Sequence, residues 1–127
     1  MKTTLTCKIA VSLAVAAALT LVVAPCAMAQ TFPNKPLRIV VPFPPGSGSD
    51  HAGRIMGQSM SEILKQPIVV ENRAGANGIV GTEYVKRGVG DPYTMVLAAS
   101  TTHAANVSLY KTLPYDPVKD FTPIAKI

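Results

Sequence analysis

The sequence predicts an α/β fold built on a parallel sheet, and three observations support this prediction. Short apolar runs alternate with helix-like patterns in the order strand, helix, strand, helix, strand. The connections between them are short, and right-handed crossovers then give parallel strands with helices on the faces of the sheet. Each apolar run is followed by a loop rich in Gly, Ser, Thr or Asn. In a parallel sheet these loops open on one edge, where ligands of such folds bind.

Residues 1–29 have the pattern of a cleavable export signal and are excluded from the fold. Lys2 and Lys8 form a basic start, a long apolar stretch follows, and Ala27-Met28-Ala29 fits the small-x-small pattern of a cleavage site. The apolar stretch is shorter than the roughly 20 residues of a membrane span, which disfavours an anchor. We therefore expect cleavage after Ala29 and export of residues 30–127.

Cysteine use and charge are consistent with export. Both cysteines, Cys7 and Cys26, lie in the leader, so the exported chain has no disulfide and depends on its core. A lipoprotein role for Cys26 is disfavoured because Pro25 stands where a small residue belongs. Without Lys2 and Lys8, the formal charge falls from +5 to +3 and includes no basic run. This charge suits a small anionic ligand and disfavours nucleic acid as a partner.

The first strand and its helix are expected on either side of a small-residue loop. Residues 37–41 are apolar enough for a strand that is buried on both faces. After the loop, Ser49 or Asp50 is expected to cap a helix that ends near Lys65. Apolar residues recur along this helix at three- and four-residue steps and predict its buried face. They are Ala52, Ile55, Met56, Met60, Ile63 and Leu64.

The rest of the chain repeats this arrangement. Pro, Gly and clusters of small polar residues separate the periodic segments and set their boundaries. The expected elements are a strand at 68–70, a loop at 72–78, a helix from Ile79 that residues 88–92 stop, a strand at 94–98, a polar loop at 100–103, a short helix at 104–110 and a candidate fourth strand at 121–127.

The loop after the first strand is the leading candidate for a ligand site. It runs from a strand into a helix start, so backbone N–H groups and the positive end of the helix dipole face one point, which favours an anion. The segment Gly46-Ser47-Gly48-Ser49-Asp50-His51 matches neither the dinucleotide loop G-x-G-x-x-G nor a Walker loop. It also fails the nucleophile elbow G-x-S-x-G. A tight structural turn with Asp50 as its cap is the alternative interpretation.

The two histidines give no indication of a metal site or a catalytic triad. His51 and His103 are the only histidines, and no metal-ligand spacing surrounds them, so neither a metal nor a cofactor is expected. Each is expected to hydrogen-bond within its loop, and no catalytic residue is predicted. The alternative function from another class is an exported hydrolase of small acids or esters, using Ser47 or Ser49 with one of these histidines.

Other polar residues have two open roles. Asn77 and Asn106 are expected as helix caps or loop braces first and as ligand contacts second. Arg73 suits a bidentate contact to a ligand carboxylate, and it equally suits a brace to Glu71 or Asp91.

With these residues in view, the sequence resembles the Bug family of periplasmic solute-binding proteins, the receptors associated with tripartite tricarboxylate transporters. The resemblance runs from Phe32 to the last residue. It departs where Ser47 interrupts a run of glycines, and where Pro92 stands in place of glycine before Tyr93. The matching blocks are Pro33-Asn34-Lys35-Pro36, Ile39 to Gly46, Asp50, Val70 to Gly78, Tyr93-Thr94, Ser100 to His103, Asn106, Ser108-Leu109-Tyr110 and Leu113 to Phe121.

The resemblance implies a two-lobed fold of the type II periplasmic-binding-protein class, with residues 30–127 as the N-terminal part of lobe 1. It implies a monomeric, non-enzymatic receptor that captures a small carboxylate between its lobes for the membrane components of a transporter. It maps the ligand loops to Phe43, Gly46, Ser47, Gly48, Ser49, Asp50, Asn77, Ser100, Thr101, Thr102 and His103. Since family members are much longer, the second lobe is expected to be absent. We therefore expect this chain alone to bind weakly or not at all, and a non-functional truncated product is a further alternative.

Overall fold

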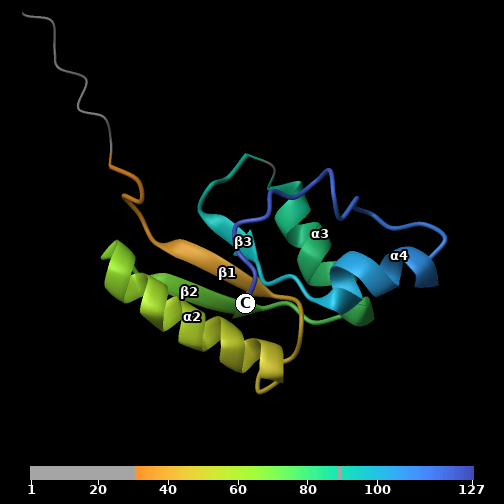
Figure 1. Ribbon diagram of the computed structural model, residues 1–127, viewed down its shortest axis with the longest axis horizontal. Coiled ribbons are helices and arrows are strands. Elements are labelled where there is room, and N and C mark those ends of the chain that lie inside the picture. The colour runs from red at the N-terminus through yellow and green to blue at the C-terminus, as the bar shows by residue number, and fades with distance from the viewer. Residues whose placement is uncertain (1–30, 89) are drawn as a thin grey trace, which may run out of the picture. The chain divides into compact units, whose positions relative to one another are not determined.

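A three-stranded parallel sheet forms the centre of the described chain (Figure 1). The computed structural model describes residues 31–88 and 90–127, so the expected signal peptide at 1–29 lies outside the described residues. The strands are β1 (Leu37–Val41), β2 (Ile68–Asn72) and β3 (Thr94–Val96), arranged in the order β2-β1-β3. Both pairings are parallel. The predicted α/β class with a parallel sheet is confirmed.

Two helices cover opposite faces of this sheet. Helix α2 (Gly48–Leu64) lies along β2, and helix α3 (Ile79–Arg87) lies beside β3 (Figure 1). Side chains alternate between the two faces of a strand, so Arg38 and Val41, three positions apart in β1, lie on opposite faces of the sheet. Arg38 donates to the Tyr84 hydroxyl of α3 at 2.8 Å, whereas Val41 packs against Gly53 of α2. The resulting core consists mainly of the central strand, with buried residues Leu37, Ile39, Val40, Val41 and Tyr115.

Helix α2 contacts the sheet through glycines. A Cβ atom built on Gly53 would lie 2.9 Å from Cγ2 of Val41, and one on Gly57 would lie 3.2 Å from Cγ2 of Val70. The helix axis therefore runs closer to the sheet than larger side chains allow. The predicted apolar face is only partly correct, because Ile55 and Ile63 are 68% and 77% exposed.

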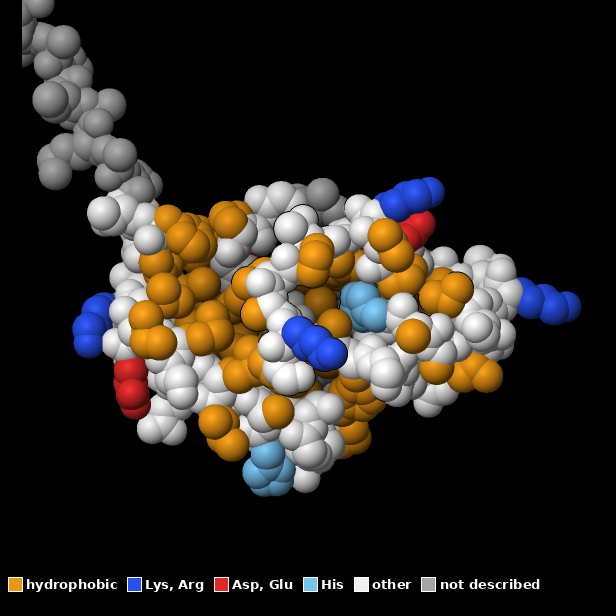
Figure 2. Space-filling view, in the orientation of Figure 1, with side chains coloured by type: hydrophobic (Ala, Val, Ile, Leu, Met, Phe, Trp, Pro, Cys, Tyr) orange, Lys and Arg blue, Asp and Glu red, His pale blue; other side chains and the backbone are white. Residues whose placement is uncertain are grey.

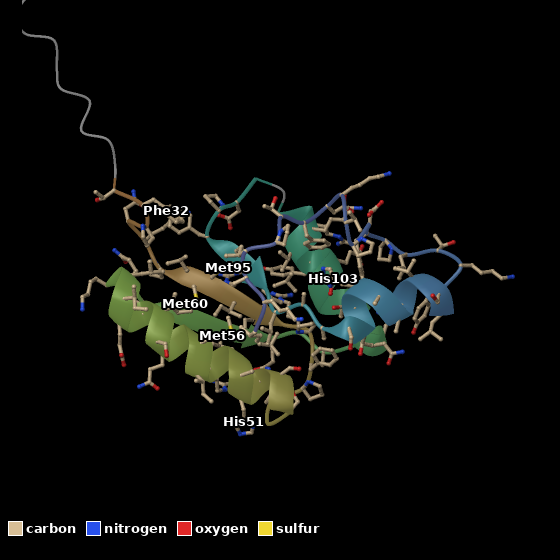
Figure 3. The ribbon with its side chains drawn as sticks, viewed as in Figure 1. Phe32, His51, Met56, Met60, Met95 and His103 are labelled. Carbon is tan, nitrogen blue, oxygen red and sulfur yellow. The ribbon has the colours of Figure 1, made fainter. Side chains whose placement is uncertain are left out.

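Apolar side chains also gather on one part of the surface. Figure 2 shows them over the region where Figure 3 labels Met56 and Met60 of α2 and Met95 of β3. All three methionines are partly exposed. None of the helices formed by residues 31–88 and 90–127 is long and apolar enough to cross a membrane.

The segment after β3 differs from its prediction. Residues 100–103 were expected as a loop, but Thr101–Ala105 form a π-helical turn, η2, that continues into the short helix α4 (Asn106–Leu109). The amides of Thr102 and His103 both donate to the carbonyl of Ala99, and the Thr102 hydroxyl bonds to the same residue, so the polar residues start a helix. Threonine side chains often form hydrogen bonds of this kind to nearby backbone groups, which can start a helical turn in a stretch that looks like a loop.

The prediction of a fourth strand is wrong. Residues 121–127 have no strand structure and pair with no neighbour in the sheet. Pro123 has no N–H group to donate to a strand ladder, which disfavours pairing in the middle of this segment.

Candidate functional site

Three connecting segments meet at the carboxyl edge of the sheet, as the sequence predicts. The last residue of β1 is bonded to the segment after β2, because the Arg73 amide donates to the Val41 carbonyl at 2.9 Å. The segment after β2 contains a tight turn, η1 (Ala76–Gly78), whose Asn77 carbonyl accepts from Asn106 Nδ2 at 3.1 Å. Asn106 begins α4, in the segment after β3. Hydrogen bonds therefore join the end of β1, the segment after β2 and the segment after β3, in chain order.

Ser47 caps α2, and this differs from the prediction of Ser49 or Asp50. Its backbone is extended (φ −71°, ψ 161°), and its hydroxyl accepts from the Asp50 amide at 3.2 Å. The helix consequently starts at Gly48, two residues earlier than expected. A serine hydroxyl that satisfies the amide three residues on is a common N-cap.

Asp50 braces the first loop from inside. Its carboxylate is buried and accepts from the Gly46 amide at 2.9 Å, from Arg54 Nε at 3.1 Å and from Asn72 Nδ2 at 2.9 Å. The Arg54 hydrogen bond, followed by those from Gly46 and Asn72, holds the pKa of this carboxyl well below its usual value of 3.8. A charged, fully engaged carboxylate shapes the loop and is unsuited to contacting an anion.

The backbone amides of the first loop include donors with a hydrogen-bond acceptor and donors without one. The Gly46 amide donates to Asp50, the Ser47 amide to the Pro44 carbonyl at 3.3 Å, and the Asp50 amide to the Ser47 hydroxyl. Among the described residues, no hydrogen bond engages the amides of Gly48 and Ser49. These are the first two N–H groups of α2, at the positive end of its dipole. They are the donors available to an anion.

In the second loop, Asn77 is exposed and Arg73 is engaged within the protein. Asn77 has a left-handed backbone (φ 53°), and its Nδ2 donates to the Tyr110 hydroxyl at 3.3 Å. Arg73 donates to Glu71 Oε1 at 2.6 Å, and its guanidinium lies 3.5 Å from the ring centre of Tyr84. The sequence left open a ligand contact or a structural brace for Arg73, and the structure favours the brace, which Arg73 forms with Glu71.

In the third segment, the predicted residues divide into buried and accessible ones. Thr102 is fully buried, and its hydroxyl bonds to the Ala99 amide and carbonyl, each at 3.0 Å. His103 is half-buried with its ring 5.1 Å from that of Phe121, and burial lowers the pKa of this imidazole. Ser100 is exposed and Thr101 is partly exposed. The hydroxyl groups of Ser100 and Thr101 therefore lie on residues that a ligand can reach.

The histidines do not form a catalytic arrangement with the serines of the first loop. His51 Nδ1 lies 3.0 Å from the Ser47 carbonyl oxygen, and His103 Nδ1 lies 2.9 Å from the Thr102 hydroxyl. Figure 3 shows His51 at the start of α2 and His103 on a different element. The described residues also contain no cluster of three or more His, Cys, Asp or Glu able to hold a metal ion.

Sequence reasoning missed two braces of the first loop. Arg54 lies four residues after Asp50, so the helical spacing alone could have predicted its ion pair. Asn72 contacts the Phe43 carbonyl at 3.1 Å as well as Asp50, and only the tertiary structure places it there.

Two depressions of the described surface lie away from these loops. One of about 620 Å³ is at the amino edge of the sheet, and Lys35, Arg38, Arg87 and Tyr93 contribute to its lining. Another of about 400 Å³ lies between α2 and β2. The candidate site is therefore identified by its unengaged donors, the amides of Gly48 and Ser49, and not by a cavity.

Comparison with known proteins agrees with this arrangement. The family model described as "Tripartite tricarboxylate transporter family receptor" matches residues 52–127. Protein BugT of Bordetella pertussis is 37% identical over 100 residues, which cover 78% of this chain and 31% of that protein.

Solved structures of binding proteins share both fold and sequence with the chain. The periplasmic binding protein BugD is 38% identical with a TM-score of 0.69, over 73% of this chain and 31% of that one. MatC of Rhodopseudomonas palustris, solved with bound malate, is 38% identical with a TM-score of 0.69, over 72% and 31%. Another R. palustris protein, solved with adipate, is 36% identical with a TM-score of 0.70, over 72% and 31%.

The chain spans about three tenths of the length of these relatives. The family match nevertheless covers more than half of the chain, and the fold agrees with that of the solved binding proteins. The chain therefore belongs to the family of tripartite tricarboxylate transporter receptors, which are solute-binding proteins and not enzymes.

Proposed function

We propose that this chain provides carboxylate-binding loops of a solute receptor that serves a tripartite tricarboxylate-type transporter. One observation carries the proposal: within residues 31–88 and 90–127, no hydrogen bond engages the amides of Gly48 and Ser49, at the N-terminus of a 17-residue helix. An anion at such a position receives hydrogen bonds and the favourable field of the helix dipole. The relatives solved with malate and with adipate support a small carboxylate as that anion.

The predicted site residues take two roles in this proposal. The ligand carboxylate accepts from Gly48 and Ser49, while Phe43, Asn77, Ser100 and Thr101 border it. The braces keep the loops in place: Gly46 and Ser47 form the turn and its cap, Asp50 ties the first loop to β2, and Thr102 and His103 shape the third segment.

Location and partners follow from the same proposal. Export would proceed by cleavage after Ala29 and would place residues 30–127, as part of the first lobe, in the periplasm, which is where the binding-protein relatives are found. There the monomeric receptor would pass its carboxylate to the membrane components of the transporter. No cofactor is required, because binding uses only backbone amides and neutral side chains.

A substitution of Gly48 tests the proposal with little risk to the fold. Proline removes the N–H group, yet it is favoured at the first position of a helix. Ser47 already has the extended backbone that a residue before proline needs, and a Cβ atom on Gly48 meets nothing within 4 Å. Gly48→Ala is the matched control because it keeps the N–H group.

Titration of each variant with malate and adipate, followed by NMR, gives the readout. The sequence leaves open weak binding or none for this chain alone, and the proposal predicts weak binding, because the donors are present but contact a ligand from an exposed edge. Gly48→Ala should keep this affinity, and Gly48→Pro should lower it by roughly tenfold or more, the value of a hydrogen bond to a charged group. Equal affinity of the two variants, or no binding by the unaltered chain, would contradict the proposal.

A further inference from the structure

The turn after β2 holds four consecutive residues with positive φ. They are Gly75 (146°), Ala76 (46°), Asn77 (53°) and Gly78 (84°). Glycine adopts such angles freely, but alanine does so only with strain, and asparagine with less. A strained backbone persists where the surrounding structure holds it in place. The contacts of this turn should therefore reveal the residue that holds it.

Asn106 makes the decisive contact from another element. Its side chain is fully buried, and Nδ2 donates to the carbonyl oxygen of Asn77 at 3.1 Å. The other contact to Asn77 comes from the exposed Tyr110, at 3.3 Å. Asn106 lies 29 residues further along the chain, so this bond fixes the second loop against the third segment.

The acceptor of the same side chain has no partner. Asn106 Oδ1 is buried and makes no hydrogen bond within the described residues. Burying an unpaired amide oxygen costs free energy that an apolar side chain of the same size would not. A purely structural core position would favour leucine here. The hydrogen bond from Nδ2 to the Asn77 carbonyl explains an asparagine at position 106 better than packing does.

The second and third loops also interlock by shape. A Cβ atom on Gly78 would lie 2.5 Å from Cγ2 of Thr102, so the Thr102 methyl group fills the space that a side chain at position 78 would need. Tyr115 holds Thr102 from the other side, because its hydroxyl donates to the Thr102 carbonyl at 2.7 Å. The third segment is thus a fixed support against which Asn106 can position the second loop.

We propose that Asn106 is a positioning residue for the ligand site: it holds the left-handed turn at Asn77 and so directs the Asn77 side chain toward the binding edge. This inference rests on the proposed function for its effect on ligand binding. The conformational part does not, because it concerns only the hydrogen bond from Asn106 to Asn77.

Hydrogen exchange in the unaltered chain tests the bond without any substitution. The side-chain NH₂ protons of Asn106 should exchange at least about tenfold more slowly than those of the exposed Asn77, since they are buried and hydrogen-bonded. Similar rates for the two side chains would overturn the inference.

The variant Asn106→Leu tests positioning. The Gly78 amide, which donates to Gly75 at 2.9 Å, should exchange roughly tenfold faster, whereas the Arg73 amide, bonded to Val41, should change much less. Adding Ala76→Gly should restore part of the protection of Gly78, because it removes strain from the turn. Equal acceleration at Gly78 and Arg73, with no rescue, would show a general loss of stability and overturn the inference.

Malate titration of the same variant separates this inference from the proposed function. A several-fold weaker affinity of Asn106→Leu, beside unchanged binding by Ser59→Val at an exposed position of α2, supports positioning. Unchanged affinity together with a loosened turn contradicts a role in the ligand site. Absence of malate binding by the unaltered chain contradicts the proposed function, while the exchange rates still decide the role of Asn106 in the turn.

Discussion

At the scale of single residues, the polar side chains of the three loops divide into braces and accessible groups. Asp50 and Thr102 are buried and bonded within the protein, whereas Ser100 and Asn77 are exposed. The sequence motif shared with the family includes residues of both kinds. Burial separates them, because a buried and engaged side chain contributes by fixing the backbone that carries the accessible groups.

The lowered pKa of Asp50 predicts a loss of stability in acid. Its contribution is fully present above the unfolded pKa of 3.8 and is lost as the pH falls through the lower folded value. Asp50→Asn should therefore reduce the fall in Tm between about pH 7 and about pH 3. The fall should persist in part, since the pKa of Asp91, Asp116 and Asp120 is also lowered. Thermal melts across this range provide the measurement.

Glu62→Gln, an exposed carboxylate of α2, is the control for this prediction. It should leave the pH dependence close to that of the unaltered chain. If Asp50→Asn behaves like Glu62→Gln at every pH, Asp50 does not brace the loop through its charge.

Two glycines with nearly equal φ provide a second prediction. Gly46 (81°) has open space at its Cβ position, whereas Gly78 (84°) has the Thr102 side chain there. Gly46→Ala should lose about 1 kcal/mol for the left-handed backbone. Gly78→Ala should lose that amount and about 1–3 kcal/mol more for the clash. Urea denaturation compares the two variants, and equal losses would show that the second and third loops are not tightly packed.

At the scale of elements, the sequence predicted the three strands of the sheet and the two helices that cover it, but it wrongly predicted a fourth strand and misplaced some boundaries. Apolar periodicity identified β1, β2 and α2, because burial of a sheet and a helix face leaves a strong pattern. It failed for Thr101–Ala105, where the Thr102 hydroxyl and the Ala99 carbonyl start a helical turn within a polar stretch. The N-cap of α2 is Ser47 and not Ser49 or Asp50, since each of several small polar residues in a row is able to cap a helix.

The glycine contacts of α2 provide a prediction at this scale. Gly53→Val would place side-chain atoms where Cγ2 of Val41 already lies 2.9 Å from the Cβ position, so it should destabilise the chain by about 1–3 kcal/mol. Ser59→Val, at an exposed position of the same helix, is the matched control and should change stability by about 0.5 kcal/mol or less. Chemical denaturation measures both; a similar effect of the two substitutions would contradict close helix–sheet packing.

At the scale of the whole molecule, the family resemblance added what local patterns could not. The order of elements predicts a parallel sheet and an edge of converging loops, and the structure agrees. Local patterns did not distinguish the brace Asn72 or the two unengaged amides, because these depend on which donors find partners after folding. The sequence thus predicts which residues belong to the candidate site, and the structure shows which of them are buried braces and which are accessible.

The central claim is that a small carboxylate binds at the start of α2, and an NMR titration of the chain with malate tests it most directly. The largest shifts of backbone amides should fall on Gly48 and Ser49, with smaller ones at Ser100 and Thr101. The amides around Lys35 and Arg38, at the opposite edge, should not change. Shifts centred on that opposite edge, or none near Gly48 at saturating malate, would contradict the account.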